Sequence, residues 1–229
     1  MSAILQSKAI DLAQSQSFYQ RLNFQLIEQS EKSYVSDGKV IIELHTDRFA
    51  RSGVQLYRST WEAVLPRITP TQHIVDIEGG HLLSAPSGCW IYLMNGPAPF
   101  TELPQSDQAT FFGNCAGLSL ETTDMVRSIH FWEILGFKKT MGAIEQGWIG
   151  LANAEGFGLS IMKALACPHS FYNPSLSYFN GKNNLALIAK IRATGLPITE
   201  EITVFNPEGI VDNIIMRDPG GFGFFIFSD

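Results

Sequence analysis

Hydrophobic and polar positions form a pattern that occurs twice along the chain. Residues 11–24 read DLAQSQSFYQRLNF and residues 124–137 read DMVRSIHFWEILGF, an offset of 113 positions without a gap. In the first copy the apolar positions fall near helical spacing, at Leu12, Phe18, Tyr19 and Leu22. This spacing predicts a helix in each copy. Asp11 and Asp124 are placed to cap the two helix N-termini, where a carboxylate accepts hydrogen bonds from free backbone N–H groups.

Strand-like runs surround each repeated helix in the same order. In the first half we predict a strand at 3–10 before the helix and strands at 25–28, 33–36 and 40–45 after it. In the second half the corresponding runs are 115–120, 138–141, 147–151 and 158–162. The order then recurs less clearly, with helices at 61–68 and 183–194 and strands at 53–57, 73–77, 81–84, 90–94, 176–179, 202–205, 212–216 and 222–227. The chain is therefore predicted to contain four βαβββ units, paired two by two.

A second repeated segment lies near the end of each half. Residues 85–88 read APSG and residues 218–221 read DPGG, and Pro86 and Pro219 are 133 positions apart. The second half therefore carries about 20 extra residues, which we place around 164–174. The predicted organisation is an N-terminal domain at 1–96, a proline-containing linker at 97–110 and a C-terminal domain at 111–229.

Composition narrows the class of protein. The 229 residues are 45% apolar and 17% charged, which is typical of a globular chain with a sizeable core. A net charge of −6 and the lack of a basic cluster argue against nucleic acid or an anionic membrane as partner. The three cysteines lack the spacing of a disulfide framework or a zinc site. We find no signal peptide and no apolar run long enough to span a membrane, so we predict a cytoplasmic protein.

The repeated segments resemble those of the vicinal oxygen chelate superfamily, which includes glyoxalases, bleomycin-resistance proteins and extradiol dioxygenases. Its helix typically begins DL-x-x-S-x-x-FY and ends LGF, which 11–24 and 124–137 match; its last unit typically closes on a DP-x-G turn, which 218–221 match well and 85–88 loosely. The resemblance covers nearly the whole chain. It implies an α+β fold of two domains. Each domain would be a pair of βαβββ modules that form a curved, mostly antiparallel eight-stranded sheet, with helices outside and a concave pocket within.

The resemblance also implies a divalent metal in many members, held by His or Gln from first strands and Glu from closing strands. Aligned from the helix starts, the first-strand positions hold Ile4, Gly117, Gly53 and Leu176, with Gln6 and Gln55 nearby. The closing-strand positions hold Glu43, Tyr92, Phe225 and, in the third unit, Ser160 or Ile161. One carboxylate is too few donors for a divalent ion. We therefore predict no metal and no other cofactor.

Several aromatic and polar residues are expected to face the concave sides of the sheets and form a pocket for a small organic molecule. These candidate ligand-binding residues are Gln6, Glu43, His45, Gln55, Tyr57, Trp90, Tyr92, Trp148 and Phe225. The alternative is that the rings fill the concave faces as core. Glu43 and His45 share a strand face and could form an acid–base pair or a polar clamp. The alternative for this pair, which we favour, is the solvated end of an edge strand.

Three functions remain open from the sequence. The first is a metal-independent protein of the glyoxalase and bleomycin-resistance type that binds a small organic molecule for sequestration or resistance. The second is a lyase, isomerase or dioxygenase of the same superfamily, in which Glu43 could act as a base without metal. The third is a structural or protein-interaction role with both concavities filled. A small molecule is the expected partner, and assembly as a homodimer stays open.

Overall fold

The computed structural model describes residues 3–104 and 109–228, so part of the predicted linker, 105–108, lies outside the described residues. The N-terminal half consists of β1 (Ala3–Lys8), α1 (Leu12–Arg21), β2 (Gln25–Gln29), β3 (Lys32–Ser36), β4 (Ile41–His45), β5 (Gly53–Arg58), α2 (Leu65–Ile68), β6 (Ile74–Ile77), β7 (Gly80–Ser84) and β8 (Trp90–Asn95). This order is two consecutive βαβββ modules, as the repeat predicts.

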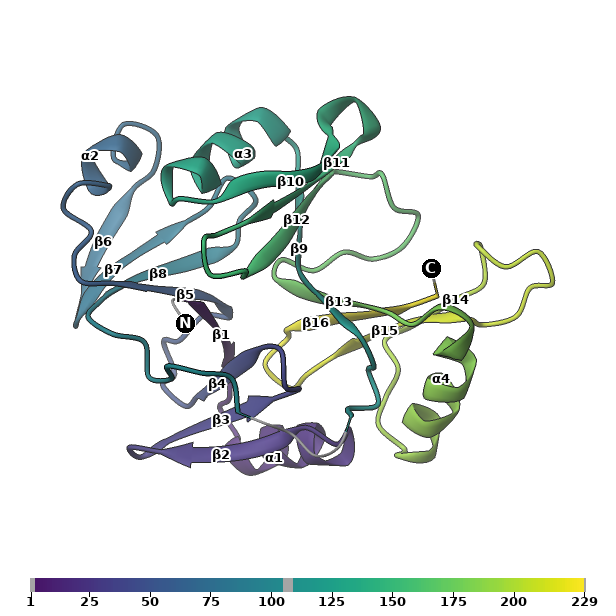
Figure 1. Ribbon diagram of the computed structural model, residues 1–229. Coiled ribbons are helices and arrows are strands. Elements are labelled where there is room, and N and C mark those ends of the chain that lie inside the picture. The colour runs from purple at the N-terminus through teal and green to yellow at the C-terminus, as the bar shows by residue number, and fades with distance from the viewer. Residues whose placement is uncertain (1–2, 105–108, 229) are drawn as a thin grey trace.

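The C-terminal half repeats the same order. It consists of β9 (Cys115–Thr122), α3 (Met125–Ile134), β10 (Lys138–Ala143), β11 (Trp148–Ala152), β12 (Gly158–Lys163), β13 (Ser175–Phe179), α4 (Asn184–Ala193), β14 (Glu200–Ile202), β15 (Asn213–Arg217) and β16 (Gly223–Phe227), with short 3₁₀ turns at Ile144–Gln146 and Gly181–Asn183. Figure 1 shows the strands of both halves in the middle of the molecule and the four α-helices at its margins.

Each half forms one eight-stranded sheet, in the order β2-β3-β4-β1-β5-β8-β7-β6 and β10-β11-β12-β9-β13-β16-β15-β14. Within each module the first and last strands pair in parallel, as β1 with β4 and β5 with β8 do. The remaining pairs are antiparallel, including β1 with β5, which joins the two modules of a half. The predicted α+β class and the mostly antiparallel sheets are confirmed.

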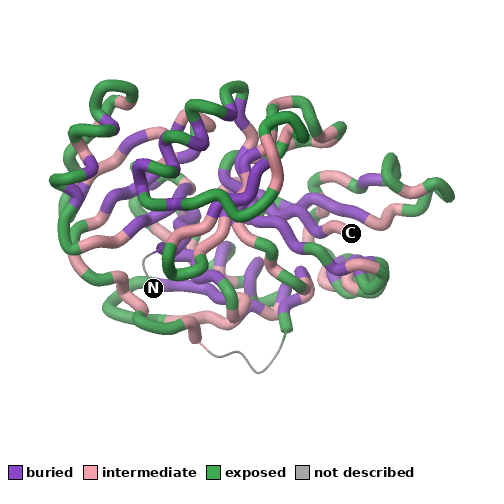
Figure 2. The backbone as a smooth tube through the Cα atoms, turned by 45° about the horizontal axis from the view of Figure 1, so that its top comes forward, coloured by how far each residue is buried: buried purple, intermediate pink, exposed green. Residues whose placement is uncertain are grey.

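The repeated helices begin and pack as their sequence predicts. Asp11 and Asp124 accept hydrogen bonds from the backbone N–H groups of Gln14 and Arg127, both over 2.9 Å. The apolar side chains of α1 and α3 enter one core that extends through both halves. Buried positions, purple in Figure 2, follow the strands where the two halves meet. The predicted burial of the repeated helix face, at Phe18, Leu22, Phe131 and Leu135, is confirmed.

The closing turn of the C-terminal half ties the halves together through Asp218. This carboxylate is 5% exposed and accepts hydrogen bonds from Ser7 Oγ at 2.5 Å and from Tyr19 Oη at 2.8 Å, both in the N-terminal half. It also accepts one from the backbone N–H of Phe222 at 2.7 Å. Burial raises the pKa of Asp218, and the hydrogen bonds from Ser7 and Tyr19 oppose that shift. The aspartate of the DP-x-G turn therefore has a structural role between the halves.

Three sequence-based expectations need correction. The strand predicted at 202–205 is observed at Glu200–Ile202. The helix predicted at 61–68 is confined to Leu65–Ile68, because Pro66 lacks the N–H that a longer helix would bond to the carbonyl of Glu62. The extra residues of the second half are also not gathered at 164–174. The offset between matched strand positions grows from 113 at Gln6 and Ser119 to 122 at Gln55 and Ser177. It reaches 133 at Tyr92 and Phe225, so the largest increase lies between β13 and β16.

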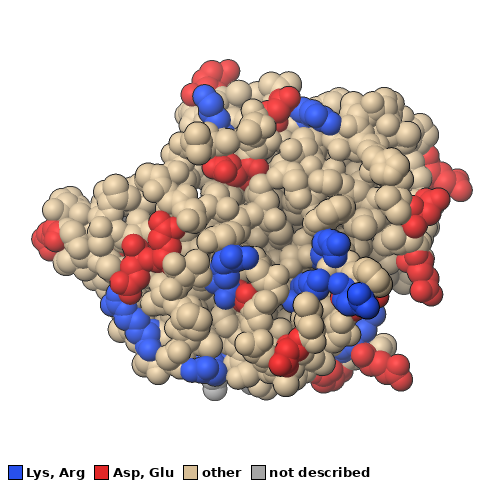
Figure 3. Space-filling view, turned by 180° about the vertical axis from the view of Figure 1, so that it is seen from behind, with Lys and Arg blue, Asp and Glu red and all other residues tan. Residues whose placement is uncertain are grey.

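Two further features, the length of the helices and the distribution of surface charge, concern a membrane or nucleic acid as partner. None of the helices in the described ranges is long and apolar enough to cross a membrane. On the face drawn in Figure 3, basic side chains lie among acidic ones, consistent with the net charge of −6.

Candidate functional site

The concave face of the N-terminal sheet carries a central row of polar side chains. Gln6 on β1 is aligned with Glu43 on β4, and Gln55 on β5 is aligned with Tyr92 on β8. All four are buried, Glu43 to 2% exposure. Glu43 lies on an interior strand between β3 and β1, so the expectation of a solvated edge position was wrong. The sequence pattern alone does not indicate which strands pair with β4, because strand order is a property of the whole sheet.

Hydrogen bonds within this row satisfy its polar atoms internally. Gln55 Nε2 donates to Gln6 Oε1 at 2.6 Å and to Glu43 Oε2 at 2.8 Å. Tyr57 Oη donates to Gln55 Oε1. Gln6 Nε2 donates to the carbonyl of Arg51 at 2.8 Å, and Tyr92 Oη donates to the same carbonyl at 3.2 Å. The amide of Gln55 therefore lies at the centre of the network.

The negative charge of the Glu43 carboxylate is compensated by the neighbouring ammonium group of Lys32. Lys32 Nζ lies 3.0 Å from Glu43 Oε1, and His45 Nε2 lies 3.9 Å from the same oxygen. Burial, and then the charge of Glu43, raises the pKa of Tyr34 to about 12 and that of Tyr57 further. Burial also raises the pKa of Tyr92. The phenols of Tyr34, Tyr57 and Tyr92 therefore stay protonated at neutral pH. The Glu43 carboxylate is already paired with Lys32.

The linker fills the remaining space of the N-terminal concavity. Phe100 and Leu103 pack against a small apolar cluster on the concave face that includes Ile4, Tyr34 and Ile41. The rings of Tyr34 and Phe100 meet edge to face with centroids 4.9 Å apart. Gln29 Nε2 donates to the carbonyl of Pro99 at 3.0 Å and holds the linker in place. The N-terminal concavity is thus filled by the protein's own side chains.

The C-terminal concavity is hollow. It contains a cavity of about 730 Å³ between the central strands of the sheet and the loops beyond β12 and β14. Its aromatic wall comprises Phe171, Phe179, Phe205, Phe225 and Phe227, and Trp148 lies at the opposite side. His169 packs its ring edge against Phe225 and Phe227, with centroid distances of 5.5 and 5.2 Å. A volume of this size falls within the range of sites for small organic molecules.

Side chains at matched positions of the two sheets explain the hollow in the C-terminal half. Strand registers align six large N-terminal side chains with six small C-terminal ones. The pairs are Ile4 with Gly117, Gln6 with Ser119, Tyr34 with Gly150, Ile41 with Gly158, Glu43 with Ser160 and Gln55 with Ser177. At Gly117 the backbone requires glycine, because φ is +118° and a Cβ would lie 2.8 Å from the carbonyl oxygen of Gly158. Glycine and serine therefore replace the residues that would fill the sheet's concave face.

The extra residues of the C-terminal half build the cavity's walls. Cys167, His169 and Phe171 lie in the loop between β12 and β13, and Phe205 lies between β14 and β15. These are segments in which the offset between the halves increases. The second half thus has less side-chain volume on the floor of its concavity than the first and has longer loops with aromatic residues around it.

Three serine hydroxyls lie together on the floor of the cavity. Ser119 Oγ is 2.7 Å from Ser177 Oγ and 3.1 Å from Ser160 Oγ. Ser119 and Ser177 are buried, with 4% and 6% exposure. We refer to Ser119, Ser160 and Ser177 as the serine trio. Its members occupy the positions that Gln6, Glu43 and Gln55 hold in the other half.

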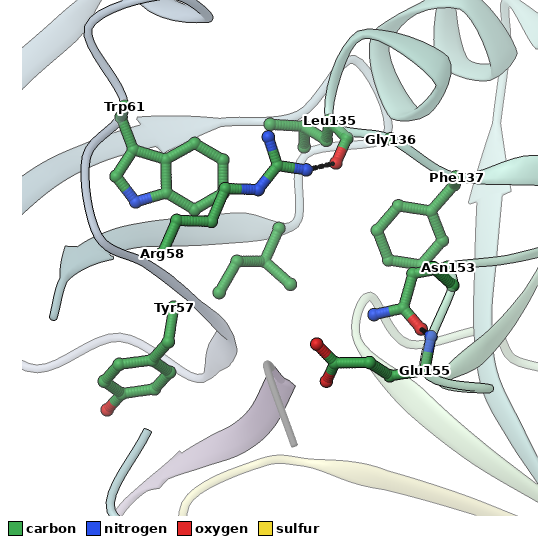
Figure 4. A pocket seen from close by; sticks show the side chains of 10 residues that line it. Tyr57, Arg58, Trp61, Leu135, Gly136, Phe137, Asn153 and Glu155 are labelled. Atoms are coloured by element: carbon green, nitrogen blue, oxygen red, sulfur yellow. Dashed lines mark hydrogen bonds between the residues drawn. The ribbon is translucent and has the colours of Figure 1, made fainter. Parts of the chain in front are cut away.

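A second, smaller cavity of about 140 Å³ lies at the boundary of the two halves. Figure 4 shows Arg58 lying along Trp61, with its guanidinium turned toward Leu135. The guanidinium carbon is 4.6 Å from the Trp61 ring centroid, and Nη2 donates to the carbonyl of Leu135 at the end of α3. The contacts of Arg58 are explained by packing between the halves, so we do not assign a ligand to this cavity.

Comparison with known proteins supports the architecture. No family model and no curated protein matches the sequence. Solved structures match over nearly the whole chain. A halotolerant catechol dioxygenase, BphC, superposes with a TM-score of 0.57 at 12% identity, over 100% of this chain and 86% of the other. The Mn(II)-bound glyoxalase from Novosphingobium aromaticivorans gives 0.58 at 14% identity, over 99% and 81%. The chain has the vicinal oxygen chelate fold. Identities this low establish the fold alone.

The vicinal oxygen chelate fold raises the question of whether a divalent metal fits either concavity. The C-terminal row offers three neutral hydroxyls and the ring of Phe225, none of which is a strong ligand for a divalent ion. The N-terminal row offers one carboxylate, Glu43, whose oxygens already bind Lys32 and Gln55. Among the described residues no three His, Cys, Asp or Glu side chains come together. Neither donor set fits the metal that the fold family implies.

The structure corrects the register of the ligand positions within the vicinal oxygen chelate fold. The sequence alignment placed the first-strand positions at Ile4, Gly117, Gly53 and Leu176. The residues that occupy the central concave row are instead Gln6, Ser119, Gln55 and Ser177, one or two residues further along. Leu176 points into the common core. Ile4, Gly117 and Gly53 lie two residues before the row, on the same strand face, whereas Leu176 lies one residue before Ser177, on the opposite face.

The structure divides the sequence-predicted site residues between the two concavities. Seven belong to the N-terminal sheet, namely Gln6, Glu43, His45, Gln55, Tyr57, Trp90 and Tyr92. All of these except Trp90 take part in the polar network or its ion pairs. Only Trp148 and Phe225 line the C-terminal cavity. Sequence reasoning named Gly117 and Ser160 at aligned positions but did not bring Ser119, Ser160 and Ser177 together as a site, because the side-by-side pairing of β9, β12 and β13 is not visible in the sequence.

We expect protein purified without chelator to contain no stoichiometric divalent metal. The physical reason is the donor chemistry described above, since a hydrated cation in an apolar cavity without anionic ligands loses more solvation energy than it regains. Elemental analysis, followed by titration with Zn²⁺, Ni²⁺, Mn²⁺ and Fe²⁺, measures this directly. One bound metal per chain that is lost in Glu43→Ala would contradict the prediction and favour an enzyme.

Proposed function

We propose that this protein binds a small organic molecule in the C-terminal concavity and does so without a metal ion. The observation that carries the proposal is the replacement of six large side chains by glycine and serine on the C-terminal sheet, which leaves a cavity of about 730 Å³. The N-terminal concavity, built on the same fold, is filled by side chains and by the linker. A hollow in one of two similar halves supports a binding role for that half.

The two concavities and the burial of Glu43 favour binding over the other functions that the sequence left open. A purely structural role requires both concavities to be filled, and this description fits only the N-terminal half. A base role for Glu43 requires an accessible carboxylate, whereas Glu43 is 2% exposed and paired with Lys32 and Gln55. The dioxygenases and the glyoxalase that share the fold provide a precedent for small-molecule sites in this architecture.

The test refills the cavity with the side chain that the other half uses. Gly158 matches Ile41, and a Cβ at Gly158 would meet only the carbonyl oxygen of Leu151 at 3.9 Å, an ordinary contact. Gly158→Ile should therefore fold. We expect 2-naphthol to bind the wild-type protein in calorimetric titration and Gly158→Ile to weaken its affinity at least about tenfold, because the added side chain occupies the ligand's volume.

The matched control is Ala193→Ile, which adds the same side chain on the exposed surface of α4. Its affinity for 2-naphthol should equal that of the wild type. Equal binding by folded Gly158→Ile would show that the ligand lies elsewhere. Failure of the wild type to bind 2-naphthol at all would overturn the proposal for aromatic molecules.

A further inference from the structure

We propose that the ligand of the C-terminal cavity is an uncharged molecule with an apolar body and one oxygen-bearing group, and that this oxygen is bound by the serine trio. The inference rests on the proposed function and states which chemistry that site selects. In this arrangement neutral hydroxyls take the place of a metal at the centre of the concave face. The pocket would bind a neutral oxygen through hydrogen bonds and would reject an ionised ligand.

The cavity lining excludes a charged ligand. Among the described residues that line the cavity there is no Asp, Glu, Lys or Arg, and the titratable side chains of this described lining are Cys167 and His169. Both belong to the loop between β12 and β13, where His169 packs against the rings of Phe225 and Phe227. An ion that moves from water into such an environment loses its hydration without gaining a partner of opposite charge. An anionic carboxylate and a cationic amine are therefore both disfavoured.

The hydrogen-bond inventory of the trio leaves capacity for one ligand group. Three hydroxyls carry three protons, and the two bonds that Ser119 makes with Ser160 and Ser177 use two of them. One proton remains free to donate, and unused lone pairs remain to accept. A single hydroxyl, carbonyl or ether oxygen satisfies this remainder.

The rest of the cavity suits an apolar body. Gly117, Gly150 and Gly158 leave space on the floor, Met162 adds an apolar side chain, and the wall is aromatic. The side chain of Asn213 is already engaged in part, because its oxygen accepts from Ser228 and one of its two N–H groups donates to Asp212. At about 730 Å³ the cavity is also much larger than the roughly 150 Å³ that holds one benzene ring. A ligand of two or more rings fits this space.

The experiment compares three probes that share one ring system: naphthalene, 2-naphthol and 2-naphthoate. Calorimetric titration of the wild-type protein at neutral pH should give about tenfold tighter binding of 2-naphthol than of naphthalene, from one added hydrogen bond. 2-Naphthoate should bind at least about tenfold more weakly than 2-naphthol, because its carboxylate is ionised. Equal affinity for naphthalene and 2-naphthol, or tight binding of 2-naphthoate, would overturn the inference and leave the proposed function standing.

A triple variant locates the effect. Ser119→Ala, Ser160→Ala and Ser177→Ala together remove all three hydroxyls, so no buried partner is left unsatisfied and the fold should persist. We expect the triple variant to bind 2-naphthol as weakly as naphthalene, with naphthalene affinity unchanged. Ser84→Ala on β7 of the other half is the matched control and should keep the tenfold preference. If the triple variant also keeps the tenfold preference for 2-naphthol over naphthalene, the assignment of the bound oxygen to the serine trio is overturned. Wild-type protein that binds none of the three probes would instead overturn the proposed function.

Discussion

Replacement of Phe131 by alanine should lower the free energy of unfolding by about 3–5 kcal/mol. Phe131 lies on the buried face of α3 and is 3% exposed. Its ring packs edge to face against Trp132, with centroids 5.7 Å apart. Alanine removes this contact and leaves a cavity in the core that both halves share, which neighbouring side chains can fill only in part. Chemical denaturation monitored by circular dichroism measures the loss.

The control for this prediction lies on the same helix. Val126 is 64% exposed, so Val126→Ala should change the free energy of unfolding by less than about 0.5 kcal/mol. A loss below about 1 kcal/mol for Phe131→Ala would mean that α3 buries a different face.

Asp218→Ala should cost about 2–4 kcal/mol of stability. The substitution leaves the hydroxyls of Ser7 and Tyr19 and the backbone N–H of Phe222 without their acceptor, at a place with almost no solvent access. Each unsatisfied buried donor costs about 1–3 kcal/mol, and the sum is reduced because a buried carboxylate no longer needs to be desolvated. Thermal and denaturant unfolding of the variant measure the loss.

Two comparisons identify the cause of the Asp218 effect. Tyr19→Phe removes one of the three donors and keeps the ring packed against Phe224, so it should cost about 1 kcal/mol. Asp11→Ala, which removes an exposed helix cap, should cost a similar amount and serves as an aspartate control. A loss for Asp218→Ala no greater than for Asp11→Ala would contradict the structural role of this carboxylate.

The raised pKa of Asp218 adds a pH dependence with a definite sign. Because burial raises this pKa in the folded state, the folded protein holds the proton to higher pH than the unfolded chain does. The contribution of Asp218 is therefore fully present below the unfolded pKa of about 3.9 and is lost as pH rises through the folded value. The stability difference between wild type and Asp218→Ala should be larger at about pH 4 than at about pH 8. The opposite order would show that the carboxylate is stabilised in its ionised form.

Much of the architecture followed from local patterns. The helix caps Asp11 and Asp124 and the buried helix face around Phe18 and Phe131 are short-range features, because a helix repeats every 3.6 residues and shows its apolar side in the sequence itself. The helix at 61–68 was overestimated because the effect of Pro66 on the preceding turn was not weighed. The order of four βαβββ modules emerged from the repeat alone.

The candidate site depended on long-range register. Gln6 and Gln55 are separated by 49 residues, yet their side chains share a hydrogen bond, because β1 and β5 pair at the centre of the sheet. A shift of one residue along a strand moves a side chain to the opposite face. The sequence alignment placed Leu176 at the first-strand position of the fourth module, and Leu176 enters the core, whereas Ser177, one residue further along, lies beside Ser119 on the concave face.

By itself the sequence determined the number and order of the modules and the division into two halves, because these appear as a repeat along the chain. It also determined the helix faces that enter the core, because these depend on neighbours a few residues apart. Only the tertiary structure decided which concavity is open. Phe100 fills the N-terminal one because the linker folds back over the sheet, and Ser119, Ser160 and Ser177 meet because three strands from distant parts of the chain pair side by side. The chemistry of a pocket depends on which side chains converge in space, and that convergence is set by strand pairing across the whole domain.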